Sequence, residues 1–363
     1  MRKVDFRRIA YAAIPGGGQV VVDGNYCYVG QMEPPHGTSI LDISDPRKPR
    51  VVAEIKVPWQ THSHKVRVRN GIMLVNQEAW PINEPPRIGF EPGLRIYDVS
   101  KPESPREIGF FRTARRGVHR YDFDGRYAYI SSEMKGFDGY IVVIVDLKDP
   151  TRPEEVSKWW IPGQWIDGGE IPTWTKFGHF VHHPMRFGDR LYVSCCYEGM
   201  AVVDISDLSA PKTVYRMPSI HNYYTHTVVP IPTSKDGRRR CITVDEGWWE
   251  DPAGFWVVDE TDPSAPAVVA EFNIPPGKEK WIWAAHQPHE ELLDDLLYLA
   301  WFGHGLRVVD MSDPLRPTEV GAFLPEPRTE KKEVSTNDVF VDQARGMIYL
   351  VDRNEGLDIL EMT

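Results

Sequence analysis

The amino-acid sequence predicts an all-β fold, a seven-bladed β-propeller of four-stranded blades. Three observations lead to this prediction: a short phrase that recurs along the chain, four short strands around each copy of it, and two chain ends that complement one another. A repeat of about 50 residues is typical of propellers and solenoids. Four short strands in each unit favour the propeller.

The recurring phrase consists of an apolar run, an aspartate, and a turn rich in Ser, Asp and Pro. Its clearest copy is Val202–Asp207, followed by Pro211. The leading aspartates of the seven copies are Asp42, Asp98, Asp146, Asp204, Asp259, Asp310 and Asp358. The intervals between them are 56, 48, 58, 55, 51 and 48 residues, so the array covers the chain. We therefore expect residues 1–363 to form a single domain.

Each copy of the phrase predicts the third strand of a blade, a turn and the fourth strand. Asp and Ser bond to their own backbone in turns, and Pro fixes φ and lacks an N–H donor. Upstream of the phrase lie two alternating runs, for example Phe187–Ser194. Such runs are typical of a β-hairpin, and they supply the first and second strands.

The two chain ends predict how the ring closes. The last repeat stops at Thr363, after its third strand, and the N-terminus opens with an unmatched strand-like run, Phe6–Tyr11. A propeller closes its ring or leaves an exposed strand edge. We therefore expect an N-terminal strand at residues of about 5–12 to complete the last blade.

The repeated phrase resembles the LVIVD repeat, and the resemblance extends over nearly the whole chain. Members of the LVIVD-repeat family are similar to seven-bladed propellers, so the resemblance implies the same fold. It implies no particular activity, because propellers carry many unrelated functions.

Composition restricts the classes of function. The net charge of −10 argues against a nucleic-acid surface, and no apolar run approaches the roughly 18 residues of a membrane span. The first residues have no apolar core typical of a signal peptide. The four cysteines fall on expected second strands, where disulfides are not expected. We expect a cytoplasmic protein that binds a small-molecule substrate and neither nucleic acid nor membrane.

Alignment of the repeats brings histidines to one position, at the start of the innermost strand. The residues there are His64, His119, His182, His226 and His286, with Gly18 and Asn337 in the other two blades. Innermost strands line the central channel, so five imidazoles should converge on the axis as ligands of a transition metal. His62 shares a strand face with His64, and either could point inward. The alternative is a structural use of histidine in the repeat, such as capping a turn.

Three glutamates end second strands at the same face of the ring: Glu78, Glu133 and Glu246. A carboxylate that accepts the far N–H of a metal-bound histidine fixes its tautomer and raises its basicity. We expect these glutamates to orient the histidines. The alternative is that they are solvated loop residues.

Further residues are candidates for catalysis and substrate binding. His304 and Glu198 align at the entry to the third strand, and we expect them to be catalytic. The aromatic residues expected to form a stacking pocket are Trp80, Trp174, Tyr224, Trp283 and Trp301. Packing of tryptophan between blades is the alternative. The arginines around His119, which are Arg112, Arg115, Arg116 and Arg120, could bind a carboxylate or phosphate on a ligand; the alternative is an ordinary solvated loop.

The sequence therefore predicts a metal-dependent enzyme with one divalent ion on the propeller axis. A neutral histidine set favours Fe(II), with Mn, Zn or Cu as alternatives, and favours a non-haem iron oxygenase or other oxidoreductase acting on a small, partly aromatic molecule. The layout is similar to that of carotenoid-cleavage oxygenases and oligogalacturonate lyases, without a match in sequence. The alternatives are a metal-dependent lyase, isomerase or hydrolase without a redox step, and a non-catalytic propeller that binds a protein or ligand.

Overall fold

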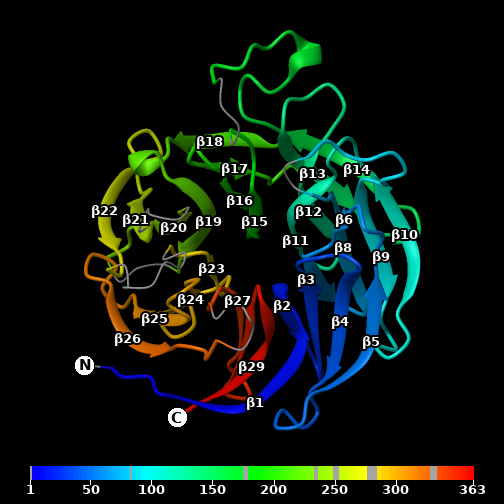
Figure 1. The fold of residues 1–363 in the computed structure, drawn as a ribbon. Helices are drawn as coiled ribbons and strands as arrows, with labels where there is room; N and C mark the ends of the chain where they lie inside the picture. Colours follow the sequence, from blue (N-terminus) through cyan, green and yellow to red (C-terminus); the bar gives the residue numbers. More distant parts are fainter. Residues whose placement is uncertain are drawn as a thin grey trace.

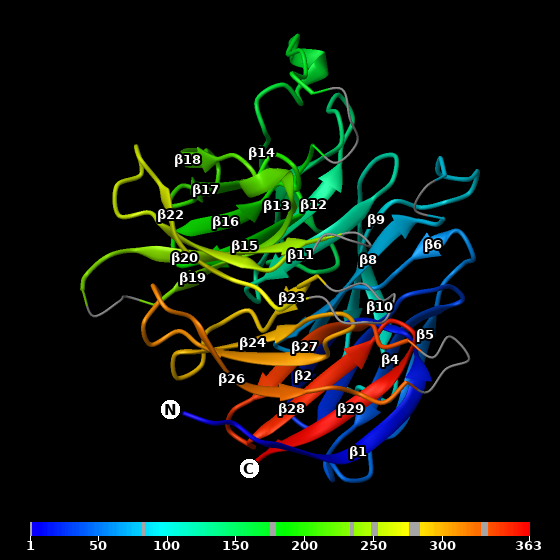
Figure 2. The same ribbon diagram turned by 60° about the vertical axis from the view of Figure 1, so that its left-hand side comes forward.

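Seven antiparallel sheets form a ring around a central axis (Figure 1). The computed structural model describes residues 2–81, 84–174, 179–232, 236–247, 253–275, 284–327 and 333–363. The view in Figure 2, turned by 60°, shows the same sheets obliquely, in the order of the chain. The predicted all-β, seven-bladed propeller is confirmed.

The first four blades follow directly from the order of the strands. Blade one contains β2 (Gly17–Asp23), β3 (Tyr26–Gln31), β4 (His36–Asp42) and β5 (Arg50–Lys56). Blade two contains β6 (Thr61–His62), β7 (Val66–Arg69), β8 (Ile72–Ala79), β9 (Gly93–Asp98) and β10 (Arg106–Arg112). Blade three contains β11 (Val118–Phe123), β12 (Tyr127–Glu133), β13 (Tyr140–Asp146) and β14 (Glu154–Trp159). Blade four contains β15 (His183–Phe187), β16 (Arg190–Ser194), β17 (Met200–Asp204) and β18 (Lys212–Met217).

The remaining three blades follow the same order, and two short 3-10 helices lie between blades. Blade five contains β19 (Tyr224–Ile231), β20 (Arg240–Glu246), β21 (Phe255–Asp259) and β22 (Ala267–Phe272). Blade six contains β23 (Gln287–Pro288), β24 (Leu296–Ala300), β25 (Leu306–Asp310) and β26 (Thr318–Phe323). Blade seven contains β27 (Thr336–Asp342), β28 (Met347–Asp352), β29 (Glu355–Met362) and β1 (Phe6–Pro15). The helices are η1 (Ile166–Gly168), in a loop that projects from the ring, and η2 (Ile220–Asn222) (Figure 1).

The N-terminal strand closes the ring as predicted. β1 pairs antiparallel with β29, with Phe6 opposite Met362 and Pro15 opposite Glu355. The strand is longer than the expected residues 5–12, because its pairing continues through a register shift to Pro15. The outer edge of β29 is therefore covered by backbone from the other end of the chain.

The aspartate of each of the first six repeats closes the turn after the third strand. Its Oδ1 accepts a hydrogen bond from the backbone N–H two residues later, as Asp204 does from Ser206 at 2.8 Å. The same bond, between 2.8 and 3.0 Å, forms at Asp42, Asp98, Asp146, Asp259 and Asp310. The repeated phrase thus builds the outer part of each blade, as its turn chemistry predicts.

Each pair of neighbouring blades shares one apolar core. Between blades three and four, for example, Val142 and Ile144 pack with Leu191 and Val203. The innermost strands are different, because they carry buried polar side chains toward the axis. The described part of the chain contains no helix with the length and apolar character that a membrane span requires. These buried polar side chains at the axis therefore mark a candidate functional site.

Candidate functional site

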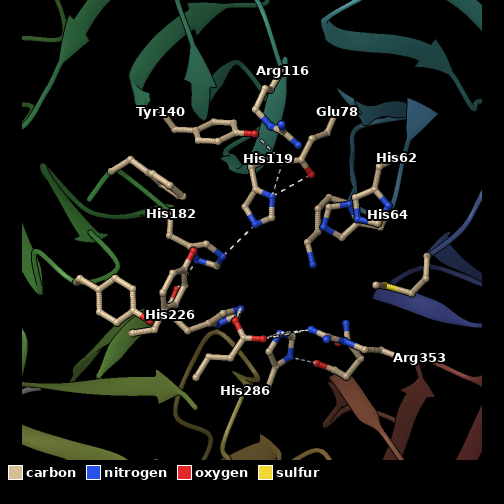
Figure 3. A pocket seen from close by; sticks show the side chains of 17 residues that line it. His62, His64, Glu78, Arg116, His119, Tyr140, His182, His226, His286 and Arg353 are labelled. Atoms are coloured by element: carbon tan, nitrogen blue, oxygen red, sulfur yellow. Dashed lines mark hydrogen bonds and ion pairs between the residues drawn. The ribbon is translucent and has the colours of Figure 1, made fainter. Parts of the chain in front are cut away.

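The predicted histidines form an arc around the propeller axis (Figure 3). They come from five consecutive blades, and each ring lies next to the ring of the following blade. The distances between ring centroids are 5.3 Å for His64–His119, 4.7 Å for His119–His182, 4.4 Å for His182–His226 and 4.1 Å for His226–His286. All but His119 are almost completely buried. The convergence expected from the repeat alignment is thus present.

An irregularity in strand pairing aims these side chains at the axis. In blade five, Thr225 pairs with Asp245 and Thr227 pairs with Val244, so that His226 between them is an extra, unpaired residue. The same register shift occurs at the equivalent positions Gly18, His119 and Asn337. Such β-bulges turn a side chain away from its regular direction and are frequent beside active sites. In blades two, four and six the equivalent histidine lies just before a regular strand begins.

The arc lines a cavity of about 530 Å³. Small-molecule sites have volumes of roughly 300–1,000 Å³. The lining residues are His62, His64, His119, His182, His226 and His286, the basic residues Lys65, Arg116 and Arg353, the acidic residues Glu78 and Glu246, the aromatic residues Tyr140, Phe180, Tyr197 and Tyr224, and Met32 and Asn337. The cavity therefore combines metal-ligand groups with a mixed wall of charged and aromatic groups.

Glu78 holds His119 in one tautomer. Both carboxylate oxygens lie 3.0 Å from Nδ1 of His119, and one of them accepts a hydrogen bond of 2.7 Å from the Tyr140 hydroxyl. A carboxylate only accepts, so Nδ1 of His119 carries the proton. Nε2 of a neutral His119 then presents a lone pair to the cavity. Glu78 thus contacts a histidine of the next blade, and its role in orienting a metal ligand stays a prediction.

His182 is held in the same tautomer by the backbone. Its Nδ1 lies 2.8 Å from the carbonyl oxygen of His226, which also only accepts, so this nitrogen carries the proton. Its Nε2 lies 2.9 Å from Nε2 of His119. Two lone pairs therefore face one another, and no described residue donates a hydrogen bond to either atom.

At neutral pH no proton lies between the two Nε2 atoms to relieve the repulsion of their lone pairs. Burial, supported by the nearby positive charges of Lys65 and Arg120, lowers the pKa of His119 well below its ordinary value. Burial also lowers the pKa of His182 well below its ordinary value, and the neighbouring His119 adds to the effect. A shared cation would resolve the contact instead. His119 and His182 would hold such a cation through these two nitrogens, because imidazole nitrogen is a common ligand of transition metals.

The last two histidines of the arc face arginines. Nε2 of His226 accepts from Nη1 of Arg120 at 3.1 Å, and Nε2 of His286 accepts from Nη2 of Arg353 at 3.3 Å. The backbone carbonyl of Asn337 fixes Nδ1 of His286 at 2.5 Å. Glu246 lies between the two rings, 4.0 Å from each Nε2. These two imidazoles have a hydrogen-bond donor already, whereas His119 and His182 do not.

At the other end of the arc, His62 and His64 form a stack that continues onto Trp80. The ring centroids are 3.7 Å apart for the two histidines and 5.0 Å apart for His62 and Trp80. Nδ1 of His62 is buried and has no hydrogen-bond partner among the described residues. Burial lowers the pKa of His62 to about 4, so its imidazole is neutral. Both histidines thus point inward, and His62 offers a further uncommitted nitrogen.

Two groups of side chains have the composition of metal sites. Each brings three donor atoms within 4.8 Å of one another: His62, His64 and Glu78 form one group, and His226, Glu246 and His286 form the other. All six side chains are buried. The pair His119 and His182 lies between these groups in the arc, so nitrogen and carboxylate donors are continuous along it. This donor set suits a borderline transition-metal ion.

Buried polar contacts beneath the histidines cross the axis. Arg120 of blade three donates to Oε1 of Gln287 in blade six at 2.7 Å, and Arg67 of blade two is paired with Glu290 of blade six. Asp338 of blade seven accepts from the backbone N–H of Val20 at 3.0 Å. The two arginine contacts tie opposite sides of the ring together below the cavity, whereas Asp338 joins blade seven to the neighbouring blade one.

Several predicted residues lie elsewhere than in the cavity. Glu133 accepts from the backbone N–H of Arg116 at 2.9 Å and contacts no histidine of the arc. Glu198 is paired with Arg216 and His179. His304 lies beside Arg307, and burial lowers its pKa to about 4. The catalytic roles of Glu198 and His304 stay predictions.

The predicted aromatic residues divide in a similar way. Tyr224 lines the cavity, and Trp80 touches it through His62. Trp174 stacks on His179, with centroids 5.7 Å apart. Trp301 is completely buried in the core between blades five and six. It therefore packs between blades, which is the alternative to a role in substrate binding. Trp283 lies outside the described residues.

One signal in the sequence points to residues that were not predicted. The residue that follows the centre of the second strand by four positions is Glu78 in blade two, and its equivalents include Met32 in blade one and Arg353 in blade seven. All three line the cavity. The repeat alignment could have found Met32 and Arg353 in this way. Tyr140 begins β13, and Phe180 and Tyr197 lie on connections between strands that the alignment does not order.

Comparison with protein-family models identifies the repeats. Residues 17–56, 123–159, 187–217 and 292–324 match the model of the LVIVD repeat. The chain contains LVIVD repeats. The suspected family and its propeller fold are thereby supported. A comparison of this LVIVD-repeat propeller with curated proteins gives no significant match.

Solved structures resemble the LVIVD-repeat propeller in fold alone. Raptor of Chaetomium thermophilum has a TM-score of 0.65 at 11% identity; the match covers 100% of this chain and 30% of Raptor. U3-55K has a TM-score of 0.65 at 10% identity, with 98% of each chain covered. The periplasmic gluconolactonase PpgL of Pseudomonas aeruginosa has a TM-score of 0.64 at 10% identity, with 90% of this chain and 88% of that chain covered. The chain thus spans about a third of the length of Raptor. At such low identity these structures show the fold alone, so a function can be inferred only from the residues of the site.

Proposed function

We propose that the protein is a metal-dependent enzyme in which His119 and His182 hold a divalent transition-metal ion at the propeller axis. The observation that supports this most directly is the contact of 2.9 Å between their Nε2 atoms, each with its lone pair inward. Glu78 and the carbonyl of His226 hold the far nitrogens. Carboxylate and carbonyl partners of this kind are typical of metal-ligating histidines.

Further candidate donors lie beside the proposed pair. His64 and His62 with Glu78 lie on one side of the pair, and His226 and His286 with Glu246 lie on the other. A bound ion would act as a Lewis acid or, if it is iron, as a one-electron donor to dioxygen. The chain itself would fix the tautomers of the ligands and keep bulk water from their buried nitrogens. Tyr140, hydrogen-bonded to Glu78, lies where it can move a proton to or from that carboxylate.

We favour an oxygenase among the redox and non-redox alternatives. Neutral imidazoles dominate the donor set, which suits Fe(II) and leaves it positively charged. Tyr140, Phe180, Tyr197 and Tyr224 offer an unsaturated molecule a surface to stack on. Fe(II) and an aromatic substrate therefore remain our proposal, with Mn, Zn or Cu as other candidate ions.

Metal analysis tests the proposal directly. The purified protein, loaded anaerobically with Fe(II) and then desalted, should retain about one equivalent or more, and His119→Ala and His182→Ala should each lose it. His36→Ala is the matched control, because His36 lies at the surface and pairs with Glu54. Retention of no Fe(II), Mn(II), Zn(II) or Cu(II) by the unmodified protein would refute a metal-dependent function.

The reaction class needs a separate measurement. An oxygenase should consume dioxygen when the Fe(II) protein is mixed with its substrate, and the Zn(II) protein should not. The fold is shared with a gluconolactonase, so hydrolysis is the second candidate. Turnover of a lactone or ester by the Zn(II) protein, without dioxygen uptake, would favour that alternative.

A further inference from the structure

The cavity beside the histidines is aromatic on one side. Tyr140, Phe180, Tyr197 and Tyr224, here called the aromatic wall, come from blades three to five and the connections between them. Tyr140 lies 5.1 Å from Phe180, and Tyr197 meets Tyr224 edge to face at 5.4 Å between centroids. Tyr224 also contacts the ring of His182, at 5.6 Å. The aromatic wall thus adjoins the pair His119 and His182.

The opposite side of the cavity is basic. Arg353, at the end of blade seven, points toward the arc from the side opposite Tyr140 (Figure 3). Lys65 in blade two also lines the cavity, and its Nζ donates to the carbonyl of Gly18 at 3.3 Å. A molecule in the cavity therefore meets aromatic rings at one end and side-chain N–H donors at the other.

Arg353 is fixed in place before any ligand binds. Its Nε donates to Oδ1 of Asn337, its Nη2 lies 3.4 Å from Glu246, and its guanidinium lies 4.5 Å from the centroid of the Phe302 ring. Its Nη1 makes no hydrogen bond to a described residue. An immobilised arginine with an unused N–H group loses little entropy when it binds an anion.

The charges around the cavity are unevenly placed. Arg116 and Arg353 line it, as do two carboxylates, Glu78 and Glu246. Burial lowers the pKa of Lys65 well below its ordinary value, so its amine is not counted as a charge. Glu78 already accepts from His119 and Tyr140, and the neutral histidines add no charge. The guanidinium of Arg353 is therefore the cationic group that an anionic ligand would meet on this side of the cavity.

We propose that this cavity binds a small aromatic carboxylate, with its ring on the aromatic wall and its carboxylate at Arg353. Nε and Nη2 of Arg353 are already engaged, so its Nη1 would donate the charge-assisted hydrogen bond to the carboxylate. In this orientation the atoms between ring and carboxylate lie over His119 and His182. The placement of these atoms over a metal ion rests on the proposed function, whereas the binding of the acid does not.

Calorimetric titration with benzoate and cinnamate tests the substrate class, with benzamide and cinnamamide as neutral counterparts of the same shape. Both acids should bind, and each amide should bind at least about tenfold more weakly, because it lacks the charge that Arg353 recognises. Cyclohexanecarboxylate should also bind more weakly than benzoate, because it cannot stack on the aromatic wall.

Substitutions locate the carboxylate. Arg353→Gln should weaken benzoate binding by about tenfold or more and leave benzamide unchanged, whereas Arg353→Lys should retain part of the preference for the acid. Arg112→Gln, on the outer strand β10, is the control and should behave like the unmodified protein.

The titrations are run on both the metal-loaded and the chelated protein. Equal affinity for acid and amide, no binding of either acid, or an unchanged affinity in Arg353→Gln would each overturn the proposal. Loss of benzoate binding on chelation, together with normal binding by Arg353→Gln, would place the carboxylate on the ion and would also overturn it. A protein that retains no metal but shows the expected Arg353 dependence would refute the proposed function and leave this inference standing.

Discussion

Nε2 of His119 and Nε2 of His182 face each other at 2.9 Å, and neither atom has a proton to share. Glu78 and the carbonyl oxygen of His226 take the one N–H of each neutral ring. Burial opposes the protonation that would otherwise separate the two lone pairs. Two consecutive blades of the ring thus hold a pair of bases in an arrangement that a bound cation would relieve.

Glu78→Gln should weaken metal binding by about 10- to 100-fold. The carboxylate fixes the tautomer of His119, and an amide would remove its negative charge and offer an N–H toward Nδ1. Competition with a chromophoric chelator measures the affinity for Zn(II). Glu133→Gln is the matched control, because Glu133 bonds to the backbone of Arg116 and not to a histidine. Equal affinities for the two variants would contradict the tautomer argument.

Arg120→Met should lower the free energy of unfolding by about 3–5 kcal/mol, the usual cost of removing one partner of a buried charged network. Arg120 is 1% exposed and supplies the donor for Gln287 and His226. Urea unfolding measures the change. Arg112→Met, at an exposed position, should change stability by no more than about 0.5 kcal/mol. Similar midpoints for both variants would show that the contacts across the axis do not stabilise the ring.

The architecture could be predicted because the residues of each repeat determine its local structure. The aspartate of the phrase closes a turn through a bond to the residue two positions later, as Asp204 and Ser206 show. A hydrogen bond of this kind depends only on neighbouring residues, so it can be predicted from the sequence. The pairing of β1 with β29 could also be inferred, because only one strand at each end lacked a partner.

The site could be predicted in part, because the repeat orders positions along each blade but not contacts between blades. The alignment brought His119 and His182 to one position, and the structure places them together. It could not show that both His119 and Arg120 reach the axis, since successive residues of a regular strand point to opposite faces. The register shift between Val118 and Tyr121 breaks that alternation.

Ile14→Ala should lower the free energy of unfolding by about 3 kcal/mol, because it removes a buried side chain from the core shared by blades one and seven. Ile14 lies on β1, so the loss measures how strongly the N-terminal strand closes the ring. Arg7→Ala on the same strand is the control. Its ion pair with Glu361 is solvent-exposed and should be worth no more than about 1 kcal/mol. An Ile14→Ala protein as stable as Arg7→Ala would mean that β1 contributes little to closure.

The metal-free protein should lose stability as the pH falls below about 6.5, the ordinary pKa of histidine. Burial lowers the folded-state pKa of the arc histidines well below that value, so in this range the unfolded chain binds protons that the folded chain does not. Acidification then favours unfolding, by up to about 1.4 kcal/mol per pH unit for each histidine. Burial also raises the pKa of Glu78, of Asp245 to about 7 and of Asp338 to about 6, which has the opposite sign. The buried histidines outnumber these carboxyls, because the pKa values of His62, His183 and His289 are lowered as well.

Urea midpoints of the chelated protein at pH 7.5, 6.5 and 5.5 measure this dependence. The midpoint should fall over both intervals, and more steeply between the last two values than between the first two, because histidine in the unfolded chain is only half protonated at about pH 6.5. His62→Gln sharpens the test. The pKa of His62 is lowered to about 4, so removing this imidazole should make the slope between pH 6.5 and 5.5 shallower by about one proton. An unchanged slope in His62→Gln, or a midpoint that rises on acidification, would mean that the buried imidazoles accept protons without unfolding.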